Sequence, residues 1–311
     1  MIVTVTMNPA IDKTVEIGRL IPGGLNRIKK AESDAGGKGI NVSKTIRELG
    51  GVSIATGFLG GSTGKAIEDF LDEKKIRHDF VLVEGETRTN TKIVEENGAV
   101  TELNEPGPQI REDEMDRLME KLISYAKPET LVILSGSIPK GVDKQIYARI
   151  IHLMHEKGAE VLLDADGELF RNGLLERPDM VKPNRVELEE YAGIDHRASN
   201  DELLALAREL RENGIKKVVV SMGKSGAIFL QDDYEAISPA LSVKAYSTVG
   251  AGDAMVAALA CAWDQKLTAK ETIRLCMAAS AGAVTTTGTK PPEKKVVEEL
   301  MQQVVIKKAE N

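Results

Sequence analysis

Short apolar runs alternate with longer amphipathic segments along most of the chain. The short runs are almost entirely apolar, as in strands buried on both faces of a parallel sheet, and cover residues 2–6, 131–134, 161–163 and 217–221. The longer segments have the periodicity of amphipathic helices and cover residues 112–125, 144–157, 269–286 and 293–304. Repeated strand and helix units predict an α/β fold, with a mostly parallel central sheet covered by helices on both faces.

Two other segments have a different pattern, which predicts a small second sheet. Residues 87–94 alternate polar and apolar positions, as a half-exposed strand does, and Asn97-Gly98 is a typical hairpin turn. Residues 14–33 are short and mixed in pattern, which favours a hairpin outside the main sheet. We therefore expect one domain over residues 1–311, with a β lid formed by about residues 13–34 and 87–104.

Composition limits the location and the partners of the protein. The 311 residues are 42% hydrophobic and 29% charged, with a net charge of −7 and a pI of about 5.4. An acidic chain argues against nucleic acid as a partner, whereas an anionic small molecule needs only a few local cations. The chain has no apolar run of membrane-spanning length and no signal peptide pattern, so we expect a cytoplasmic protein without a membrane partner. Cys261 and Cys276 fall in apolar helical segments, which predicts buried free thiols.

A glycine-containing stretch before an alanine-rich helix predicts the chemical centre. Gly250, Ala251 and Gly252 precede Asp253, and the helix follows directly. The first turn of a helix has unpaired N–H groups that bind anions, and small residues let a phosphate approach the backbone. Asp253 beside this anion hole can accept the proton of an attacking hydroxyl while the amides stabilise a transferred phosphoryl group. The alternative is that Asp253 is only a favourable acidic residue at a helix start.

Three further positions are candidates for binding a sugar or a phosphate. Gly37 precedes a helix whose first turn would present Lys38 and Asn41, although a plain strand-to-helix turn has the same pattern. Asp12 follows the first strand, where side chains of an α/β sheet face the ligand crevice, and a turn aspartate is the alternative. Arg88 is the candidate for clamping a substrate phosphate, and a solvated charge on an edge strand is its alternative.

The segment around Lys182 closes a strand and opens a helix. Asn184 and Glu187 are three residues apart, so both oxygens could reach a hydrated Mg²⁺ that bridges nucleotide phosphates. An Asn cap with a Glu in the first turn is the alternative. Residues 57–65 and 218–225 lack residues that a P-loop requires, and no Gly-x-Gly-x-x-Gly follows the first strand. A P-loop NTPase and an NAD-dependent enzyme are therefore disfavoured.

Taken together, three motifs resemble those of the PfkB family of ribokinase-like sugar kinases. The motifs are Gly36-Gly37-Lys38-Gly39-Ile40-Asn41, Lys182-Pro183-Asn184-x-x-Glu187 and Thr248-Val249-Gly250-Ala251-Gly252-Asp253. They occur in the expected order over nearly the whole chain, and the three together are far more specific than any one. The resemblance implies a ribokinase-like three-layer α/β/α fold. The family's aspartate is often followed by serine, and Ala254 at this position leaves the base intact.

Further segments are similar to the branch of this family that phosphorylates sugar phosphates. They are Thr6-Met7-Asn8-Pro9-Ala10-Ile11-Asp12, Gly24-Leu25-Asn26-Arg27 and Thr87-Arg88-x-Asn90-x-Lys92. The resemblance implies Asp253 as the proton acceptor and a magnesium site at Asn184 and Glu187. It implies a nucleotide site formed by Lys182, Asn184, Ser221, Gly223, Gly226, Thr248, Gly250 and Gly252. It implies a sugar site formed by Asp12, Gly37, Lys38, Asn41, Asn90 and Asp253, with Arg27, Arg88 and Ser137 near the existing phosphate.

The activity that this resemblance implies is transfer of the ATP γ-phosphoryl group to a ketohexose phosphate. Fructose 1-phosphate, which gives fructose 1,6-bisphosphate, is the expected acceptor, and the sequence leaves tagatose 6-phosphate and fructose 6-phosphate open as alternatives. ATP and Mg²⁺ are expected, with K⁺ as a further candidate. The resemblance also implies a homodimer in which the two lid sheets clasp. A nucleotide-binding module without catalysis is a remote alternative, which would not need an aspartate beside the anion hole.

Overall fold

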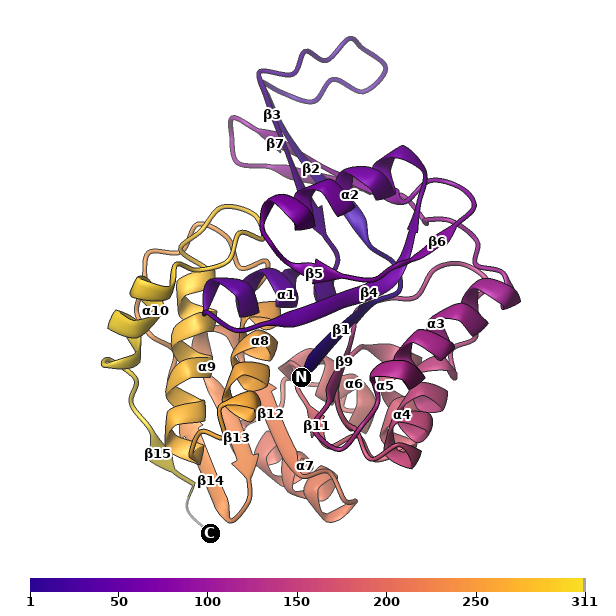
Figure 1. Cartoon of the computed structure of the whole chain (residues 1–311). Helices are drawn as coiled ribbons and strands as arrows, with labels where there is room; N and C mark the ends of the chain where they lie inside the picture. Colours follow the sequence, from indigo (N-terminus) through magenta and orange to yellow (C-terminus); the bar gives the residue numbers. More distant parts are fainter. Residues whose placement is uncertain (310–311) are drawn as a thin grey trace.

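A computed structural model describes residues 1–309, which form two β-sheets and their covering helices (Figure 1). The strands of the larger sheet are β1 (Ile2–Thr6), β4 (Ser53–Gly60), β5 (Arg77–His78), β6 (Val81–Val83), β9 (Leu131–Ser135), β10 (Glu160–Asp164), β11 (Met180–Val181), β12 (Lys217–Ser221), β13 (Ala227–Gln231), β14 (Tyr234–Ser238) and β15 (Lys307–Lys308). Their order is β15-β14-β13-β12-β11-β10-β9-β1-β4-β5, and β6 also pairs with β4. All neighbouring pairs between β12 and β5 in this order are parallel, and so is the pair of β4 and β6. The pairs from β12 to β13, β13 to β14 and β14 to β15 are antiparallel.

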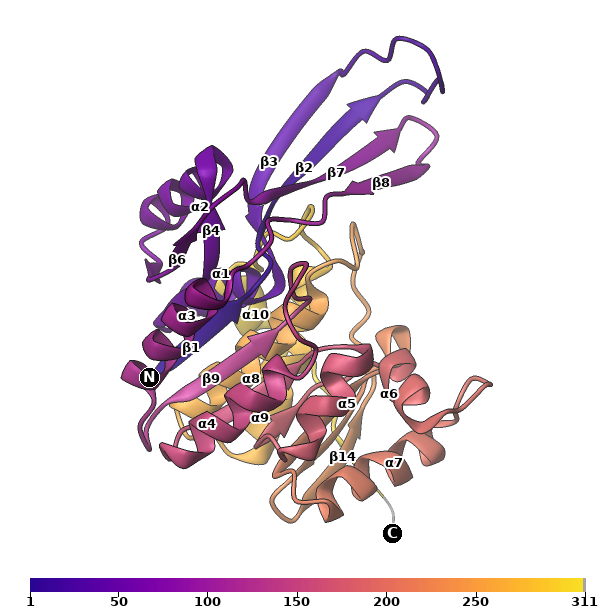
Figure 2. The same cartoon turned by 90° about the vertical axis from the view of Figure 1, so that its right-hand side faces the viewer.

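Helices cover both faces of this sheet (Figures 1 and 2). One face carries α3 (Glu112–Tyr125), α4 (Ile146–Glu156), α5 (Gly167–Leu175), α6 (Arg185–Ala192) and α7 (Asn200–Glu212). The other face carries α1 (Lys38–Glu48), α8 (Ala251–Asp264), α9 (Ala269–Ala283) and α10 (Lys294–Met301). A further helix, α2 (Gly61–Glu73), packs near β4, and the short 3₁₀ helix Gly223–Ser225 follows β12. The predicted α/β class with a mostly parallel sheet is confirmed.

Successive side chains of the parallel strands fill opposite helical layers. In β9, Val132 and Leu134 pack in the core under α3 to α7, whereas Leu131 and Ile133 pack in the core under α1, α8, α9 and α10. All four side chains are fully buried. A strand covered on both faces needs apolar residues at every position, because successive side chains point to opposite faces. This explains why the central strands were visible in the sequence as continuous apolar runs.

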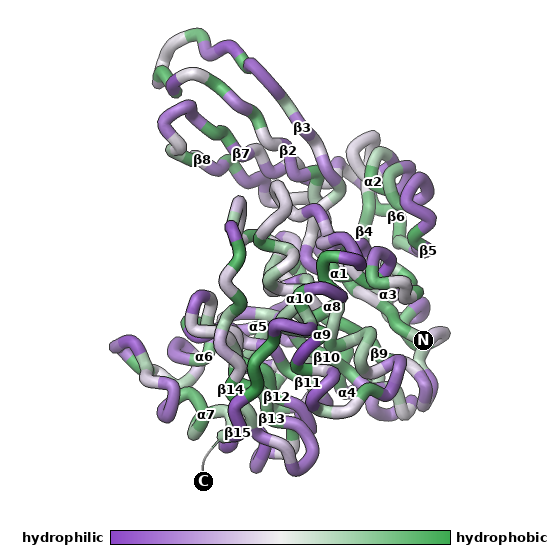
Figure 3. Tube along the Cα trace, turned by 90° about the vertical axis from the view of Figure 1, so that its left-hand side faces the viewer, coloured by the Kyte–Doolittle hydropathy of each residue, from purple (hydrophilic) through white to green (hydrophobic). Residues whose placement is uncertain are grey.

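Four strands form the second sheet, which we call the lid. They are β2 (Ala10–Ile17), β3 (Lys30–Gly36), β7 (Arg88–Glu95) and β8 (Val100–Asn104), in the order β3-β2-β7-β8. The lid projects beyond the main sheet (Figure 2), and its strands mix hydrophobic and hydrophilic residues where β12 and β13 are mostly hydrophobic (Figure 3). Both predicted lid segments contribute strands, and the first of them extends over residues 10–36.

Most element boundaries agree with the sequence pattern, with exceptions at the ends of the last two helices. Helix α9 ends at Ala283 and α10 at Met301, each three residues earlier than the pattern predicted. After α9, Thr285 Oγ1 donates a hydrogen bond of 2.7 Å to Gly282 O. Threonine side chains that bind nearby carbonyl groups compete with helix continuation. Cys261 and Cys276 are buried free thiols, as predicted. Among residues 1–309, no helix has both the length and the apolar character needed to cross a membrane.

Candidate active site

The loop before α8 prepares a helix start with free backbone donors. Gly250 has a left-handed conformation with φ 84°, which L residues with side chains rarely adopt, and Ala251 is the first helical residue. A Cβ atom at Gly252 would lie 3.6 Å from Lys182 Nζ. The helix start therefore combines small residues, the positive end of the helix dipole and a nearby ammonium group. These are the features that an anion needs at a helix N-terminus.

Asp253 lies in the first turn of α8 and is only 8% exposed. Asn41 of α1 donates a hydrogen bond of 2.9 Å from Nδ2 to Asp253 Oδ2. Burial and, next, the negative charge of Asp164 raise the pKa of Asp253 to about 6, against the opposing effects of Asn41, Lys38 and Lys182. A carboxyl group whose pKa lies near neutrality is well suited to accept a proton from a hydroxyl group.

Asp164 at the end of β10 joins two of the predicted lysines. Its Oδ1 atom lies 3.1 Å from Lys182 Nζ, and its Oδ2 atom lies 3.6 Å from Lys38 Nζ. Burial opposes ionisation, but the two ammonium groups keep the pKa of Asp164 below its usual value. Asp164 in turn raises the pKa of Lys38. Asp164 was not among the sequence-based candidates, although a polar residue at the end of a parallel strand is a signal for the ligand crevice.

Asp12, Asn90 and Arg88 lie together where the lid joins the main sheet. Asp12 and Asn90 are cross-strand partners, and Asn90 Nδ2 donates a hydrogen bond of 3.0 Å to Asp12 Oδ1. Burial raises the pKa of Asp12. Arg88 begins β7 and donates from Nη2 to Asn8 O at 3.1 Å. The expected position of Asp12 is corrected, because the residue lies inside lid strand β2 and not at the end of a main-sheet strand.

Two glycines allow the lid to lie close to α1. A Cβ atom at Gly36 would lie 2.0 Å from Asp12 Oδ2, and a Cβ atom at Gly37 would lie 2.6 Å from Thr6 Cγ2. Gly37 also has φ 105°, in the region that favours glycine. These glycines are therefore needed for packing in the absence of any ligand, and they place the first turn of α1, with Lys38 and Asn41, beside Asp253.

Several buried polar atoms in this region have no hydrogen-bond partner within the described part of the chain. They are Thr6 Oγ1, Asn8 Oδ1, Asn41 Oδ1, Arg88 Nε, Asn90 Oδ1 and Ser135 Oγ. An unsatisfied buried polar group costs about 1–3 kcal/mol, and native proteins pair nearly all such groups with protein, water or ligand. These atoms lie at the ends of β1 and β9, in the first turns of α1 and at the lid root. The arrangement fits a polar, hydroxyl-rich ligand.

Asn184 and Glu187 form a reciprocal capping box at the start of α6. Asn184 Oδ1 accepts a hydrogen bond of 3.0 Å from Glu187 N, and Glu187 Oε2 accepts one of 2.7 Å from Asn184 N. The capping interpretation is therefore correct in geometry. Burial raises the pKa of Glu187, and the nearby Lys182 acts against this effect. Metal binding at this position would have to coexist with the cap.

The donor set at this position decides what kind of metal ion fits. Residues 1–309 contain no group of three or more His, Cys, Asp or Glu side chains that could hold a metal ion. Mg²⁺ usually keeps several waters and binds one or two carboxylates together with substrate phosphates. Glu187, which lies near Lys182 and Lys38, fits that pattern, whereas a metal held by protein ligands alone does not.

The other predicted nucleotide residues come from the segments that flank this cap. Ser221 ends β12 and forms a parallel bridge with Asn184, which joins the two segments. Gly223 has φ 57°, and a side chain there would meet open space. By contrast, a Cβ atom at Gly226 would lie 1.9 Å from Ser238 O, so packing alone requires this glycine. Thr248 is exposed on the loop before α8.

Arg27 and Arg88, both predicted to bind the substrate phosphate, lie at opposite ends of the lid. Arg27 is exposed in the loop between β2 and β3, which projects away from the main sheet (Figure 2). Arg88 pairs with Ala10 at the opposite end of β2, so one chain does not bring Arg27 and Arg88 together. Ser137 is exposed and follows Gly136, where a Cβ atom would lie 3.4 Å from Lys38 Cβ.

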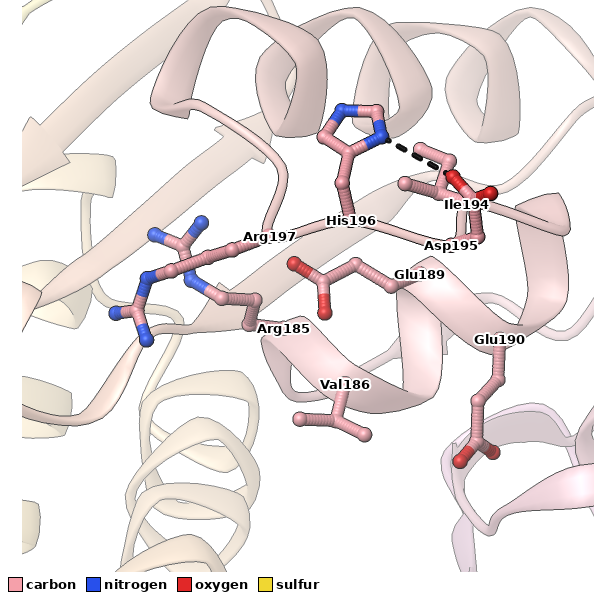
Figure 4. Close-up of a pocket in the computed structure, with 8 residues that line it drawn as sticks. All are labelled: Arg185, Val186, Glu189, Glu190, Ile194, Asp195, His196 and Arg197. Carbon is pink, nitrogen blue, oxygen red and sulfur yellow. Dashed lines mark ion pairs between the residues drawn. The ribbon is translucent and has the colours of Figure 1, made fainter.

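A separate cavity of about 340 Å³ lies beside α6 (Figure 4). It is lined by Arg185, Val186, Glu189, Glu190, Ile194, Asp195, His196 and Arg197. Two of its charged groups already bind the neighbouring backbone, because Arg185 Nη1 donates to Ala198 O and Ala198 N donates to Glu189 Oε1 at 2.8 Å. None of the residues around Asp253 lines this cavity. We place the candidate active site at Asp253 and not at this cavity, because the buried carboxylate, the lysines and the unpaired polar atoms lie around Asp253.

The fold is similar to that of a solved kinase. The crystal structure of phosphofructokinase-2 from Escherichia coli in complex with potassium has a TM-score of 0.92 and 28% identity, over 97% of this chain and 98% of that chain. The fold and the site thus define a ribokinase-like kinase. The model of the pfkB family of carbohydrate kinases matches residues 1–295. The chain therefore belongs to the pfkB family of carbohydrate kinases.

Two curated relatives cover most of the chain. The 1-phosphofructokinase of Xanthomonas campestris pv. campestris is 39% identical over an alignment of 268 residues, which covers 84% of this chain and 83% of that protein. The tagatose-6-phosphate kinase of Staphylococcus epidermidis is 33% identical over an alignment of 280 residues, which covers 88% of this chain and 89% of that protein. Membership of this kinase family implies ATP and a divalent metal ion.

Proposed function

We propose that this protein transfers the γ-phosphoryl group of ATP to fructose 1-phosphate and forms fructose 1,6-bisphosphate. The observation that carries the proposal is the position of Asp253. This buried carboxyl group lies in the first turn of α8, receives a hydrogen bond from Asn41 and has a pKa of about 6. A base and an anion hole in one helical turn are what phosphoryl transfer to a hydroxyl group requires.

In the proposed mechanism, Asp253 accepts the proton of the attacking hydroxyl group. Asn41 fixes one carboxylate oxygen at 2.9 Å and leaves the other free to face the acceptor. The new bond forms between the acceptor oxygen and phosphorus, the bond from phosphorus to the bridging oxygen breaks, and ADP leaves with that electron pair. Most of the acceleration comes from positioning and from electrostatic stabilisation, because the protein forms no covalent bond to the phosphoryl group.

Negative charge on the transferred group would be stabilised from two sides. The backbone N–H groups of Gly250 to Asp253 lie at the positive end of α8, and Lys38 and Lys182 are held nearby by Asp164. A bound Mg²⁺, with Glu187 near it, would supply further positive charge at the nucleotide phosphates. Lys182, Asn184, Ser221, Gly223 and Thr248 would position the nucleotide. Gly226 would support this site through packing and not through a ligand contact.

The acceptor would bind between the lid and α1. The unpaired oxygens of Asn41 and Asn90, together with Asp12, would receive hydrogen bonds from sugar hydroxyl groups. Arg88 would bind the existing phosphate, because its buried Nε atom has no partner within residues 1–309. Ser137 would lie at the rim of this site, near Lys38.

The choice of acceptor depends on the relatives. The X. campestris relative is named for fructose 1-phosphate and the S. epidermidis relative for tagatose 6-phosphate, and the former has the higher identity, 39% against 33%. A coupled assay with ATP and Mg²⁺ tests fructose 1-phosphate, tagatose 6-phosphate and fructose 6-phosphate in parallel. We expect the highest kcat/KM with fructose 1-phosphate, and a tenfold preference for either other sugar would overturn this choice. A pure nucleotide-binding module would show no transfer to any of the three.

We also propose that two chains associate through their lids. The lid and its connecting loop expose several large apolar side chains, namely Ile21 (54%), Leu25 (76%), Ile28 (54%), Val100 (53%) and Leu103 (57%). Clusters of exposed apolar residues mark interaction surfaces, and most soluble oligomers are symmetric dimers. In such a dimer Arg27 could reach the site of the partner chain, which would account for its distance from Arg88.

Two further parts of the proposal concern conditions. A cytoplasmic location would give the enzyme its supply of ATP and sugar phosphates. K⁺ is a candidate activator, because potassium is present in the solved phosphofructokinase-2 complex. An assay in which KCl is replaced by NaCl at equal ionic strength tests this point, and equal rates would remove K⁺ from the proposal.

A further inference from the structure

Asp34 forms a junction between the lid and two other parts of the molecule. It lies near the end of lid strand β3, and its Oδ2 atom accepts hydrogen bonds from Lys44 Nζ at 2.7 Å and from Thr289 Oγ1 at 3.4 Å. Lys44 belongs to α1, is 4% exposed and also donates to Ala35 O at 2.8 Å. Thr289 belongs to the loop between α9 and α10. One carboxylate thus connects three separate elements.

On the side of the proposed sugar site, Asp34 lies next to Asp12, a residue proposed to bind the sugar. Asp34 and Asp12 are directly opposite each other in the antiparallel pair β2 and β3. Side chains of directly opposite residues lie on the same face of a sheet, about 5 Å apart. Asp12 binds Asn90 on its other side. Any displacement of the lid that follows contact between a sugar and Asp12 therefore also displaces Asp34.

On the donor side, both partners of Asp34 lead to the anion hole. The Cα atom of Thr289 lies 3.5 Å from the position that a Cβ atom would take at Gly250, the residue before α8. Lys44 belongs to the same helix as Asn41, whose side chain binds Asp253. A second, weaker contact joins the same strand and loop, because Lys290 Nζ lies 3.8 Å from Glu32 Oε2.

We propose that Asp34 is a positioning residue that couples sugar phosphate binding in the lid to the geometry of the anion hole. This inference rests on the proposed function. Binding of the sugar phosphate orders the lid root, Asp34 then holds Thr289 and the loop beside Gly250, and the nucleotide phosphates bind a site that is already arranged. Coupling between two ligands is reciprocal, so the nucleotide must strengthen sugar phosphate binding by the same factor.

The test compares ligand coupling in three variants with that in the wild type. Isothermal titration calorimetry measures the Kd of a non-hydrolysable ATP analogue with Mg²⁺, without and with saturating fructose 1-phosphate. We expect the sugar to tighten nucleotide binding about tenfold in the wild type, within the usual range for coupled sites. Thr289→Val and Asp34→Asn should reduce this factor to below about twofold, while the Kd of each ligand alone stays within threefold of the wild type.

A matched control lies in the same loop. Thr285→Val removes a hydroxyl group that binds only Gly282 O among the described residues, and it should leave the coupling intact. Thermal unfolding of each variant shows whether the chain is folded. If Asp34→Asn does not fold, Thr289→Val still provides the test, because this variant keeps the ion pair of Lys44 and Asp34.

Each outcome separates this inference from the function on which it rests. Normal coupling in Thr289→Val, or no coupling in a wild type that binds and phosphorylates the sugar, overturns the role of Asp34 and leaves the kinase assignment standing. A wild type that binds none of the three sugar phosphates overturns both.

Discussion

The side chain of Asn41 donates a hydrogen bond of 2.9 Å to Asp253, although 212 positions separate the two residues along the chain. The contact joins the first turn of α1 to the first turn of α8, so two helix starts meet at one carboxylate. The free Oδ1 atom of Asn41 has no partner within residues 1–309 and lies beside the proposed base. Asn41 can therefore orient both the carboxylate and the acceptor hydroxyl group. The predictions that follow test this geometry.

Replacement of Asp253, the proposed base, should separate activity from stability. We expect Asp253→Asn to bind ATP normally and to lose a factor of at least about 10² to 10³ in kcat, as other centres do when a stabilising group is removed. The control is Asp264→Asn, which changes an exposed carboxyl group at the other end of the same helix. Steady-state kinetics and nucleotide titration measure the effect, and turnover of Asp253→Asn at the wild-type rate would show that the base lies elsewhere.

The same variant should become more stable than the wild type above pH 6. The folded-state pKa of Asp253 is about 6, above its ordinary value of 3.8, so the native protein holds this proton more tightly than the unfolded chain. The resulting stability is present at low pH and is lost as the pH rises through 6. Asp253→Asn avoids this loss, on the order of 2 to 3 kcal/mol at pH 8. Urea unfolding at pH 4 and pH 8 measures the difference, and no gain at pH 8 would contradict a buried charge at this position.

The pH dependence of the wild type should report the same group. Protonated Asp253 cannot accept a proton, so kcat/KM should fall about tenfold per pH unit below a midpoint near 6. The phosphate of the substrate titrates in the same range. The inhibition constant of a sugar phosphate that cannot react, measured over the same pH range, shows how much of the fall comes from protonation of the phosphate group. A flat profile down to pH 5 would exclude Asp253 as the base.

Asp164→Asn should move that midpoint downward and weaken the site. The charge of Asp164 raises the pKa of Asp253, and its removal also frees Lys38 and Lys182 to act on Asp253. We therefore expect the acidic limb to shift below pH 6, with a lower kcat because the two ammonium groups lose their common partner. Breaking a buried pair typically costs about 3–5 kcal/mol of stability. An unchanged midpoint in a folded variant would show that the two carboxylates do not interact.

Arg88→Ala should act on the sugar phosphate and not on the nucleotide. Loss of a charged hydrogen-bond donor costs about 1.5–3 kcal/mol, which corresponds to an increase of roughly 10-fold to 100-fold in the KM for the sugar phosphate. Arg88→Lys keeps the charge without the planar fork and should recover part of the loss. Arg117→Ala, which removes an exposed arginine of α3, is the matched control. A KM for ATP that rises as much as that for the sugar would contradict the assignment.

A charge on the lid should dissociate the proposed dimer. Leu25 is 76% exposed in one chain, and an aspartate there would be buried without a partner at a lid interface. We expect Leu25→Asp to sediment as a monomer at concentrations at which the wild type is a dimer. Leu175→Asp, at an equally exposed leucine (74%) far from the lid, is the control. A monomeric wild type would remove the lid interface from the proposal.

The sequence pattern predicted the main sheet and its helices well, because buried parallel strands and amphipathic helices have strong local signals. The strand at residues 217–221 and the helix at residues 112–125 have the predicted bounds. The bounds of the lid strands were predicted less well. These strands are half-exposed, so the local pattern of polar and apolar residues does not show where they begin. Asp12 was therefore expected at a sheet edge, whereas the backbone continues through it into β2.

Motifs located the helix starts of the site but not the contacts between them. Lys38, Lys182 and Asp253 were all candidates. In the structure Asp164, which no motif marked, pairs with both lysines, and its charge raises the pKa of Asp253 nearby. The pairing of Asp34 with Thr289 is equally invisible in the sequence, since 255 positions separate the two residues. Such contacts depend on the packing of distant elements, and a single sequence carries no local signal for them.

The strand order has a consequence for synthesis on the ribosome. Strand β1 is made first but lies between β9 and β4, and the anion hole belongs to α8, which begins at Ala251. A nascent chain in which Lys38 and Asn41 have been translated still lacks Asp253 and the backbone amides of the proposed anion hole. The proposed active site would therefore be complete only after the residues from Ala251 onward have been translated and have folded against α1.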